Sequence, residues 1–556
     1  MIFRPRLRTS IVSVLLAVGA APLAAHASDG AHDGGTLKIV AASAAGTIDP
    51  HISYETGKYW PFFYITNDGL VTFKKTEGAA SAEIVPDLAE AMPKVENAGK
   101  TYVFTLRKGI KFSTGKDVTP ADVVASFQRL FKVSNPNSGS WYNVLVGADA
   151  CLKTPASCSL EGGVVADDAS GTVTFHLTQA DSEFLYKLAV PFGSILPADT
   201  PATDLGNTPA ISTGPYVIAS YDPQTSMVIK RNPYFKEWSE AAQPRGYVDE
   251  IVYTFGVKPE DAVTAIENGQ QDWMFDSAPA DRLNEMSSKY SSQIHINPRF
   301  SLFGTELNVN IPPFNNKDAR LALNYAVNRR SVINIVGGPK LAQPNCQLLP
   351  IGFPGYKPYC PYTKNPGTDW SAPDMAKAKE LMEKSGQKGQ KVTVIAGDGS
   401  SDPVIGTYLV SVLNELGFDA TLKVISENIQ WTYVQNSNNN VQITINIMNQ
   451  DYPAPSDFLY VLFSCHNFNP GSDASPNVSG YCNKEIEDKM SHAMAKAINN
   501  PITAEEMWTE IDHRLTDDAP WVTLYSPKQL DFVSNNVKNF VYSYQSRVLF
   551  SRIYLN

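Results

Sequence analysis

The sequence predicts an α/β protein with two lobes. Its 556 residues are too many for one hydrophobic core, so at least two cores are expected. Hydrophobic residues make up 43% of the chain and charged residues 18%, a balance that is typical of folded globular proteins. Segments with a two-residue apolar period alternate with segments of helical period, which indicates α/β units.

The first residues have the pattern of a cleaved secretion signal. Three arginines precede an apolar run over 11–23 and the small-x-small site Ala25-His-Ala27. The run is too short for a membrane-spanning anchor. No cysteine lies near the cleavage site, so a lipoprotein is not expected. We therefore predict a signal peptide at 1–27 and a periplasmic chain without a lipid anchor.

Charge excludes some classes of partner. Removing the signal peptide removes three positive charges and no negative one, so the formal net charge goes from −10 to −13. An acidic chain is a poor partner for nucleic acid or for an anionic membrane, and neither is expected.

The six cysteines come in three sequence-local pairs. Because an exported chain meets an oxidising compartment, disulfides are the favoured interpretation. Six cysteines allow fifteen pairings, and proximity along the chain is the only basis for choosing among them. No C-x-x-C spacing and no histidine cluster is present, so no metal site is expected. The predicted disulfides are Cys151–Cys158, Cys346–Cys360 and Cys465–Cys482.

The elements of the first lobe follow in chain order. A strand over 36–43 leads into a turn-rich loop over 45–51, and alternating apolar residues predict a second strand from 102 to 107. A helix should begin at Thr119-Pro120, because Thr is a favoured N-cap and Pro a favoured first helical residue. Downstream, the same arguments predict a strand at 172–178, a hairpin around Asp222-Pro223, a strand at 249–257 and a helix at 259–268.

The second lobe is expected to begin near Leu302. Its predicted helices cover 318–330, 371–386 and 402–417, and its predicted strands cover 391–397, 420–426 and 441–448. A last strand at 519–525 should return to the first lobe. Two strands that cross between the lobes, near 297–310 and near 515–525, would form the hinge of a closing cleft.

Several sequence blocks, in their order along the chain, closely resemble the family 5 solute-binding proteins of ABC importers, the dipeptide-, oligopeptide- and nickel-binding group. The strongest block runs from Gly99 to Leu130 (GKTYVFTLRKGIKFSTGKDVTPADVVASFQRL). The other blocks are VPDLAE at 85–90, STGPY at 212–216, RNPYF at 231–235 and APWVTLY at 519–525.

This resemblance implies the fold of a two-lobed periplasmic binding protein, type II and cluster C-like, with a hinge and an extra subdomain in the first lobe. It implies the following division: signal peptide 1–27; lobe I at 28–68, 205–298 and 519–556; a peripheral subdomain of lobe I at 69–204; and lobe II at 299–518.

The resemblance also implies a function. A monomeric periplasmic receptor would capture a peptide or peptide-like solute between its lobes and deliver it to ABC permease subunits in the inner membrane, without a cofactor. An oligosaccharide or an opine-like compound is the alternative ligand. An exported hydrolase is the alternative of another class, but the sequence contains no H-E-x-x-H, G-x-S-x-G or P-loop motif. We expect no catalytic residue and no enzyme activity.

Asp451 is the principal candidate for ligand binding. It opens the stretch DYPAPSDFL, which follows a predicted strand and contains two prolines, so it should be a loop at a strand's carboxyl end. The resemblance implies that Asp451 pairs with the α-ammonium of a peptide. A structural alternative is an Asp that caps its own turn.

Further ligand contacts are implied by the resemblance. They come from the loop after the first strand, from a Trp-containing segment and from the neighbours of Asp451. These residues are Ala45, Gly46, Trp431, Asn449 and Tyr452.

Two departures from the family pattern bear on the ligand. Met448 stands where some peptide-binding members have a Trp. No Arg occurs from Ser331 to His513, whereas dipeptide-binding members supply one near the start of the helix at 402. We therefore expect no guanidinium fork from the second lobe, which makes a free dipeptide a less favoured ligand than a longer peptide, another amine or a neutral solute.

Overall fold

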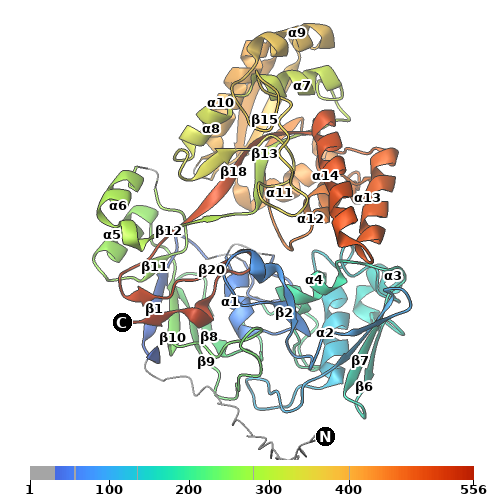
Figure 1. Cartoon of the computed structure of the whole chain (residues 1–556), viewed down its shortest axis with the longest axis vertical. Helices are drawn as coiled ribbons and strands as arrows, with labels where there is room; N and C mark the ends of the chain where they lie inside the picture. The colour runs from blue at the N-terminus through green and yellow to red at the C-terminus, as the bar shows by residue number, and fades with distance from the viewer. Residues whose placement is uncertain (1–31, 45, 55–57, 134, 280, 400) are drawn as a thin grey trace, which may run out of the picture.

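The computed structural model describes residues 32–44, 46–54, 58–133, 135–279, 281–399 and 401–556, and shows two lobes (Figure 1). The predicted signal peptide and Ala45 lie outside the described residues. Among the residues described, no helix is both long and apolar enough to span a membrane.

The first lobe is built on a five-stranded mixed sheet. Strands β11 and β10 flank β1 in parallel, and the hairpin β8–β9 continues the sheet in antiparallel pairing. Helix α1, Trp60–Thr66, packs on the sheet with every residue buried. The strands in sheet order are β11 (Trp273–Met274), β1 (Thr36–Val40), β10 (Glu250–Thr254), β9 (Ser226–Arg231) and β8 (Tyr216–Asp222). Helices α5 (Pro259–Glu267) and α6 (Leu283–Lys289) follow β10 and β11.

A second, four-stranded antiparallel sheet lies beside it in the same lobe (Figure 1). Helix α2, Pro120–Lys132, packs on this sheet and begins as predicted: the Thr119 amide donates to Asp122 Oδ2 at 2.8 Å, and the Asp122 amide donates to the Thr119 carbonyl oxygen at 3.1 Å. The elements here are β4 (Lys94–Glu96), β5 (Thr101–Thr105), β7 (Thr172–His176), β6 (Val164–Asp167), α3 (Ala148–Lys153), α4 (Phe184–Ala189) and the small pair β2 (Val71–Phe73) and β3 (Ile84–Pro86).

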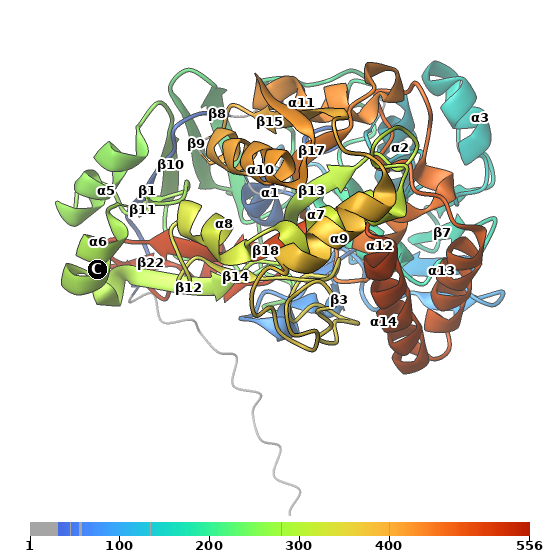
Figure 2. The ribbon, with the colours of Figure 1, turned by 90° about the horizontal axis from the view of Figure 1, so that it is seen from above.

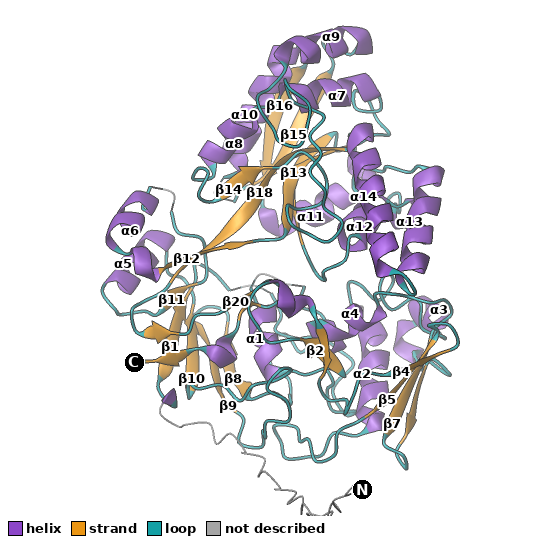
Figure 3. Ribbon diagram, in the orientation of Figure 1, coloured by secondary structure: helices purple, strands orange, loops and turns teal. Residues whose placement is uncertain are grey.

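The second lobe is organised around a seven-stranded sheet (Figure 3). Its core packs helices α7, α9 and α10 against the strands, while α12, α13 and α14 form a second core in which α13 and α14 lie side by side (Figure 2). The strands are β12 (Ile294–Pro298), β18 (Trp521–Phe532), β13 (Ser301–Leu307), β17 (Ile443–Asn449), β15 (Lys391–Gly397), β16 (Asp419–Ile425) and β14 (Ala342–Pro344). The helices are α7 (Lys317–Ala326), α8 (Arg329–Ile335), α9 (Met375–Ser385), α10 (Asp402–Leu416), α11 (Glu427–Gln435), α12 (Ser456–Phe463), α13 (Lys484–Ala497) and α14 (Pro501–Asp518).

The predicted single helix at 318–330 is wrong: it is two helices. The chain leaves helical geometry at Val327 and Asn328, and the Asn328 side chain caps the new helix by accepting from the Ser331 amide at 3.2 Å. The break turns Arg329 into the core, where its Nε donates to the carbonyl oxygens of Asn345 and Thr523. Helical periodicity alone does not reveal such an internal cap.

Strands β12 and β18 connect the lobes. They pair in antiparallel register from Ile294 opposite Phe532 to Pro298 opposite Lys528. The first half of β18 pairs with β13 inside the second-lobe sheet, and after it the chain returns to the first lobe. The remaining short strands, β19 (Val537–Lys538), β20 (Tyr542–Ser543), β21 (Arg547–Val548) and β22 (Tyr554–Leu555), lie after this return. The predicted lobe boundaries stay predictions.

The structure joins the cysteines in the three predicted pairs. Cys346–Cys360 lies in the long connection between β14 and α9, in a small cluster with the buried Trp370. This stretch has few regular elements of its own, so the disulfide is a principal restraint on its backbone.

We predict that Cys346→Ser/Cys360→Ser loosens this connection. Removing a disulfide that closes a loop of this size lowers the free energy of unfolding by about 3 kcal/mol. Amide hydrogen exchange should therefore rise across 345–372. The matched control, Cys151→Ser/Cys158→Ser, opens a loop in the other lobe and should leave 345–372 protected. Unchanged exchange in the first variant would contradict the assignment.

Candidate functional site

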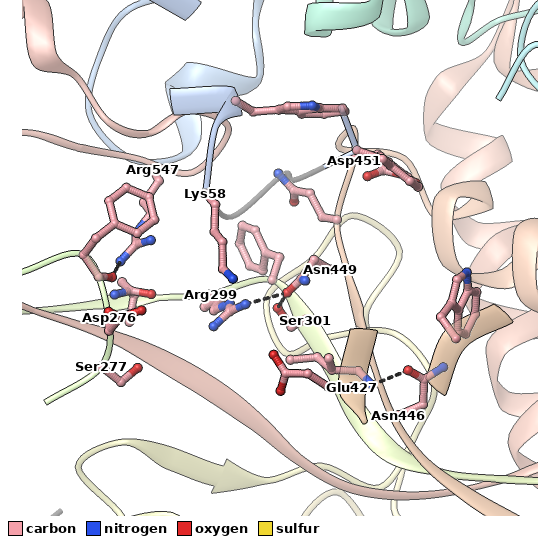
Figure 4. A pocket seen from close by; sticks show the side chains of 18 of the residues that line it. Lys58, Asp276, Ser277, Arg299, Ser301, Glu427, Asn446, Asn449, Asp451 and Arg547 are labelled. Atoms are coloured by element: carbon pink, nitrogen blue, oxygen red, sulfur yellow. Dashed lines mark hydrogen bonds between the residues drawn. The ribbon is translucent and has the colours of Figure 1, made fainter. Parts of the chain in front are cut away.

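A cavity of about 780 Å³ lies between the two lobes (Figure 4). Its volume falls within the range of pockets that hold small ligands. The first lobe contributes lining residues around 54–60, 275–277 and 542–547, and the second lobe contributes residues around 299–301, 402, 427–434 and 445–451. A ligand in this cavity contacts both lobes at once.

Asp451 lies in this cavity, in the loop that follows β17. Its side chain is 3% exposed, and Tyr54 of the first lobe donates a hydrogen bond from its hydroxyl to the carboxylate. A different residue holds the turn: Asp457 Oδ2 accepts from the Asp451 amide at 2.8 Å. Within the described residues no turn amide donates to the Asp451 carboxylate. The structural alternative, in which Asp451 caps its own turn, is therefore wrong.

Burial raises the pKa of Asp451 to about 7, and the hydrogen bond from Tyr54 offsets only part of that effect. No lysine or arginine in the described part of the chain forms an ion pair with this carboxylate. A buried carboxyl without a cation is costly to ionise, and a cationic ligand group would supply what it lacks.

Positive side chains line another part of the cavity. Lys58 and Arg547 come from the first lobe, and Arg299 comes from the link between β12 and β13. Arg299 Nη2 donates to Asn449 Oδ1 at 2.8 Å (Figure 4). A guanidinium therefore reaches the cavity from the link between the lobes, while the stretch 331–513 contributes none, because it contains no Arg.

Asp402 and Glu427 add two carboxylates to the second-lobe wall. They begin helices α10 and α11. Burial, and next the charge of Glu427, raise the pKa of Asp402 to about 6. The position where the family resemblance placed a carboxylate-binding Arg is thus acidic in this chain.

The other predicted ligand contacts divide into two groups. Asn449 lines the cavity, and so does Trp431, whose side chain on α11 is 39% exposed. Tyr452 is not among the lining residues. It is buried, and its hydroxyl donates to Glu183 Oε2 at 3.3 Å. Gly46 also lies away from the lining, where its carbonyl oxygen accepts from the Tyr221 hydroxyl at 3.3 Å. Ala45 is outside the described residues.

Sequence reasoning missed Tyr54, Lys58, Arg299 and Arg547 as cavity residues. The first two follow the loop at 45–51 by only a few residues, so a longer view of that loop would have included them. Arg299 follows Pro298, which ends β12 at the predicted crossing between lobes. In the described ranges, no group of three or more His, Cys, Asp or Glu residues could hold a metal ion.

Comparison with known proteins agrees with this architecture. Residues 83–470 match the family described as bacterial extracellular solute-binding proteins, family 5. The dipeptide-binding protein of Escherichia coli K12 is 27% identical over 500 residues, which cover 85% of each chain.

Two solved structures share the fold. The clavulanic acid biosynthesis oligopeptide binding protein 2 superposes with a TM-score of 0.84 at 20% identity, covering 94% of this chain and 96% of the other. A periplasmic binding protein associated with an ABC transporter of Helicobacter pylori, in complex with the peptide STSA, gives 0.76 at 22% identity, covering 94% and 98%.

We predict a pH-dependent effect of Asp451→Asn on the ligand-free protein. The pKa of Asp451 is raised to about 7 when folded, whereas an unfolded Asp titrates near pH 4. The folded wild type therefore holds the extra proton in this window, and its stability falls as pH rises from about 4 to about 7. At pH 8 the variant should be more stable by on the order of 1 kcal/mol or more, and near pH 4 the difference should vanish.

Urea unfolding at pH 4.5 and pH 8 measures this difference. Asp488→Asn, which removes an exposed carboxylate of α13, is the matched control and should shift neither curve. A stabilisation by Asp451→Asn of equal size at both pH values would contradict the prediction.

Proposed function

The chain belongs to the bacterial extracellular solute-binding proteins of family 5, and from that premise we propose that it is the periplasmic receptor of an ABC importer for a peptide or peptide-like solute. The ligand binds in the cavity between the lobes and is delivered to the permease in the inner membrane. We propose further that the leader at 1–27 exports the chain, that it works as a monomer without a lipid anchor or cofactor, and that it carries out no chemistry.

One observation carries the proposal for the ligand class. The Asp451 carboxylate is buried in the interlobe cavity and has a neutral hydroxyl, Tyr54, as its polar partner. An ammonium group placed there forms a charge-assisted hydrogen bond in a region of low dielectric. Peptides carry such a group at their amino terminus, which agrees with the names of the relatives that bind dipeptides and oligopeptides.

A neutral, hydroxyl-rich solute is the second candidate. The accessible face of Trp431 and a set of cavity amides favour it, because an aromatic face and amide groups suit sugars as well as peptides. These amides belong to Gln430, Asn446, Asn449 and Gln450. A hydrolase is less well supported, since the lining residues that the structure describes include no histidine or cysteine.

The crossing strands provide the means of closure. β12 and β18 pair with each other and join the lobes, so bending near them changes the width of the cavity. A ligand that contacts both lobes favours the closed state by its differential affinity for that state. Capture and release then follow from a shift in population.

We predict that variants of Asp451 separate the two candidates. For an ammonium ligand, Asp451→Ala leaves the cation buried and unpaired and should weaken binding by about 2–5 kcal/mol, or roughly 30- to several-thousand-fold. Asp451→Asn should be severe as well, because it keeps the shape and removes the charge. For a neutral solute, Asn retains an acceptor and should cost much less.

The measurement is calorimetry with the compound that denatured wild-type protein releases, identified by mass spectrometry. Asp488→Asn should bind like wild type. Near-wild-type affinity of Asp451→Asn would exclude the ammonium role. Turnover of the released compound during the titration would instead support the hydrolase.

A further inference from the structure

Two cations in the interlobe cavity have no carboxylate partner among the described residues. Arg299 donates to the neutral amide oxygen of Asn449 at 2.8 Å. Lys58 lines the same cavity and takes part in no ion pair that the structure shows. Arg547 differs, because its guanidinium lies 3.3 Å from Asp531 and 4.2 Å from the ring centre of Phe275.

The surroundings of Arg299 make an anionic ligand group favourable. Burial is the main cause that lowers the pKa of Arg299, and the positive charge of Arg547 is the second. The charged guanidinium therefore loses favourable hydration at this position. Arg299 donates one side-chain hydrogen bond, to a neutral acceptor. Among the described residues, its other N–H groups have no acceptor within hydrogen-bond distance. Guanidinium groups bind carboxylates through two parallel hydrogen bonds, which would satisfy those donors.

We propose that Arg299 and Lys58 form a carboxylate subsite, so that the ligand is a zwitterion with its carboxylate at the hinge. The proposal rests on the proposed function, in which Asp451 receives the ammonium group. Arg299 lies in the link between β12 and β13, and Lys58 lies in the first lobe, so a carboxylate held by both connects the first lobe to the crossing strands. In Figure 4 the Lys58 side chain extends toward Arg299.

The two subsites are linked through Asn449. Arg299 contacts Asn449, and Asp451 is two residues farther on. Both groups line the same cavity of about 780 Å³, so one ligand can meet both of them.

Two carboxylates of the second lobe disfavour a ligand carboxylate beside them. Asp402 and Glu427 carry negative charge there, and no ion pair neutralises either residue within the described part of the chain. A carboxylate beside them would meet like charges, whereas Arg299 and Lys58 supply positive charge. Arg547 is already paired with Asp531, and Asp276 also lines the cavity near Arg547 (Figure 4). Arg299 and Lys58 are therefore the favoured place for a ligand carboxylate.

The test uses three synthetic mixtures of di-, tri- and tetrapeptides. The first has free carboxyl termini and contains no Asp or Glu. The second has the same sequences with carboxyl-terminal amides. The third consists of amides that carry one Asp or Glu side chain. Wild-type protein is equilibrated with each mixture at pH 8, and bound peptides are quantified by mass spectrometry.

We expect the free acids to bind at least about 30-fold more tightly than the matching amides. Binding of acids and amides within threefold of each other would overturn the subsite and leave the proposed function standing. No binding from any mixture would overturn the peptide function and the subsite together. Binding of the third mixture but not the second would show that a side-chain carboxylate occupies the subsite.

Variants assign the effect to the residues. Arg299→Gln should reduce the preference for acids to less than about threefold, and Lys58→Gln should reduce it in part. Arg330→Gln removes an exposed arginine outside the cavity and should keep the wild-type preference. An unchanged preference in a folded Arg299→Gln protein would overturn the role of Arg299. The comparison of acids with amides on wild type remains decisive if that variant does not fold.

Discussion

The antiparallel pairing of β12 with β18 is the constraint on which the rest of the structure depends. It brings the outgoing and returning chain together between the lobes, and a second pairing, of β13 with β17, places Ser301 opposite Asn449. Arg299 directly follows β12, and Asn449 ends β17, so the two pairings together place both groups at the cavity. The proposed binding site thus lies beside the connection that would bend if the lobes close.

The cavity holds ionisable groups that a protein interior normally avoids. Asp451 is buried beside a tyrosine, and the half-buried Arg299 contacts an asparagine, so each group has a neutral polar partner. Such groups lower the stability of the empty protein. In the proposed mechanism, the same groups bind a ligand with complementary charges more tightly in the closed state than in the open one, and this difference in affinity drives closure.

Much of the fold followed from the sequence because its signals are local. The N-cap at Thr119, the hairpin at Asp222-Pro223 and the helix over α10 depend on residues within a few positions of each other. The family resemblance supplied the architecture and the place of Asp451. It did not supply Arg299, Lys58 or Tyr54, because these residues reach the cavity only through tertiary packing between the lobes. The break at Asn328 was missed for a related reason, since a buried arginine with distant carbonyl partners determines it.

The same pairing of strands also makes the second lobe an insertion within the first. The chain enters it at the end of β12 and leaves it along β18, at positions that lie opposite each other, such as Pro298 and Lys528. Everything between these positions could be excised and replaced without stretching the remaining backbone, as in domain exchange between homologous proteins. Exchange of the inserted segment would transfer Arg299, Asp402 and Asp451 together. Lys58 and Tyr54 would remain with the first lobe of the recipient protein. New specificities could therefore arise by combining the halves of two receptors.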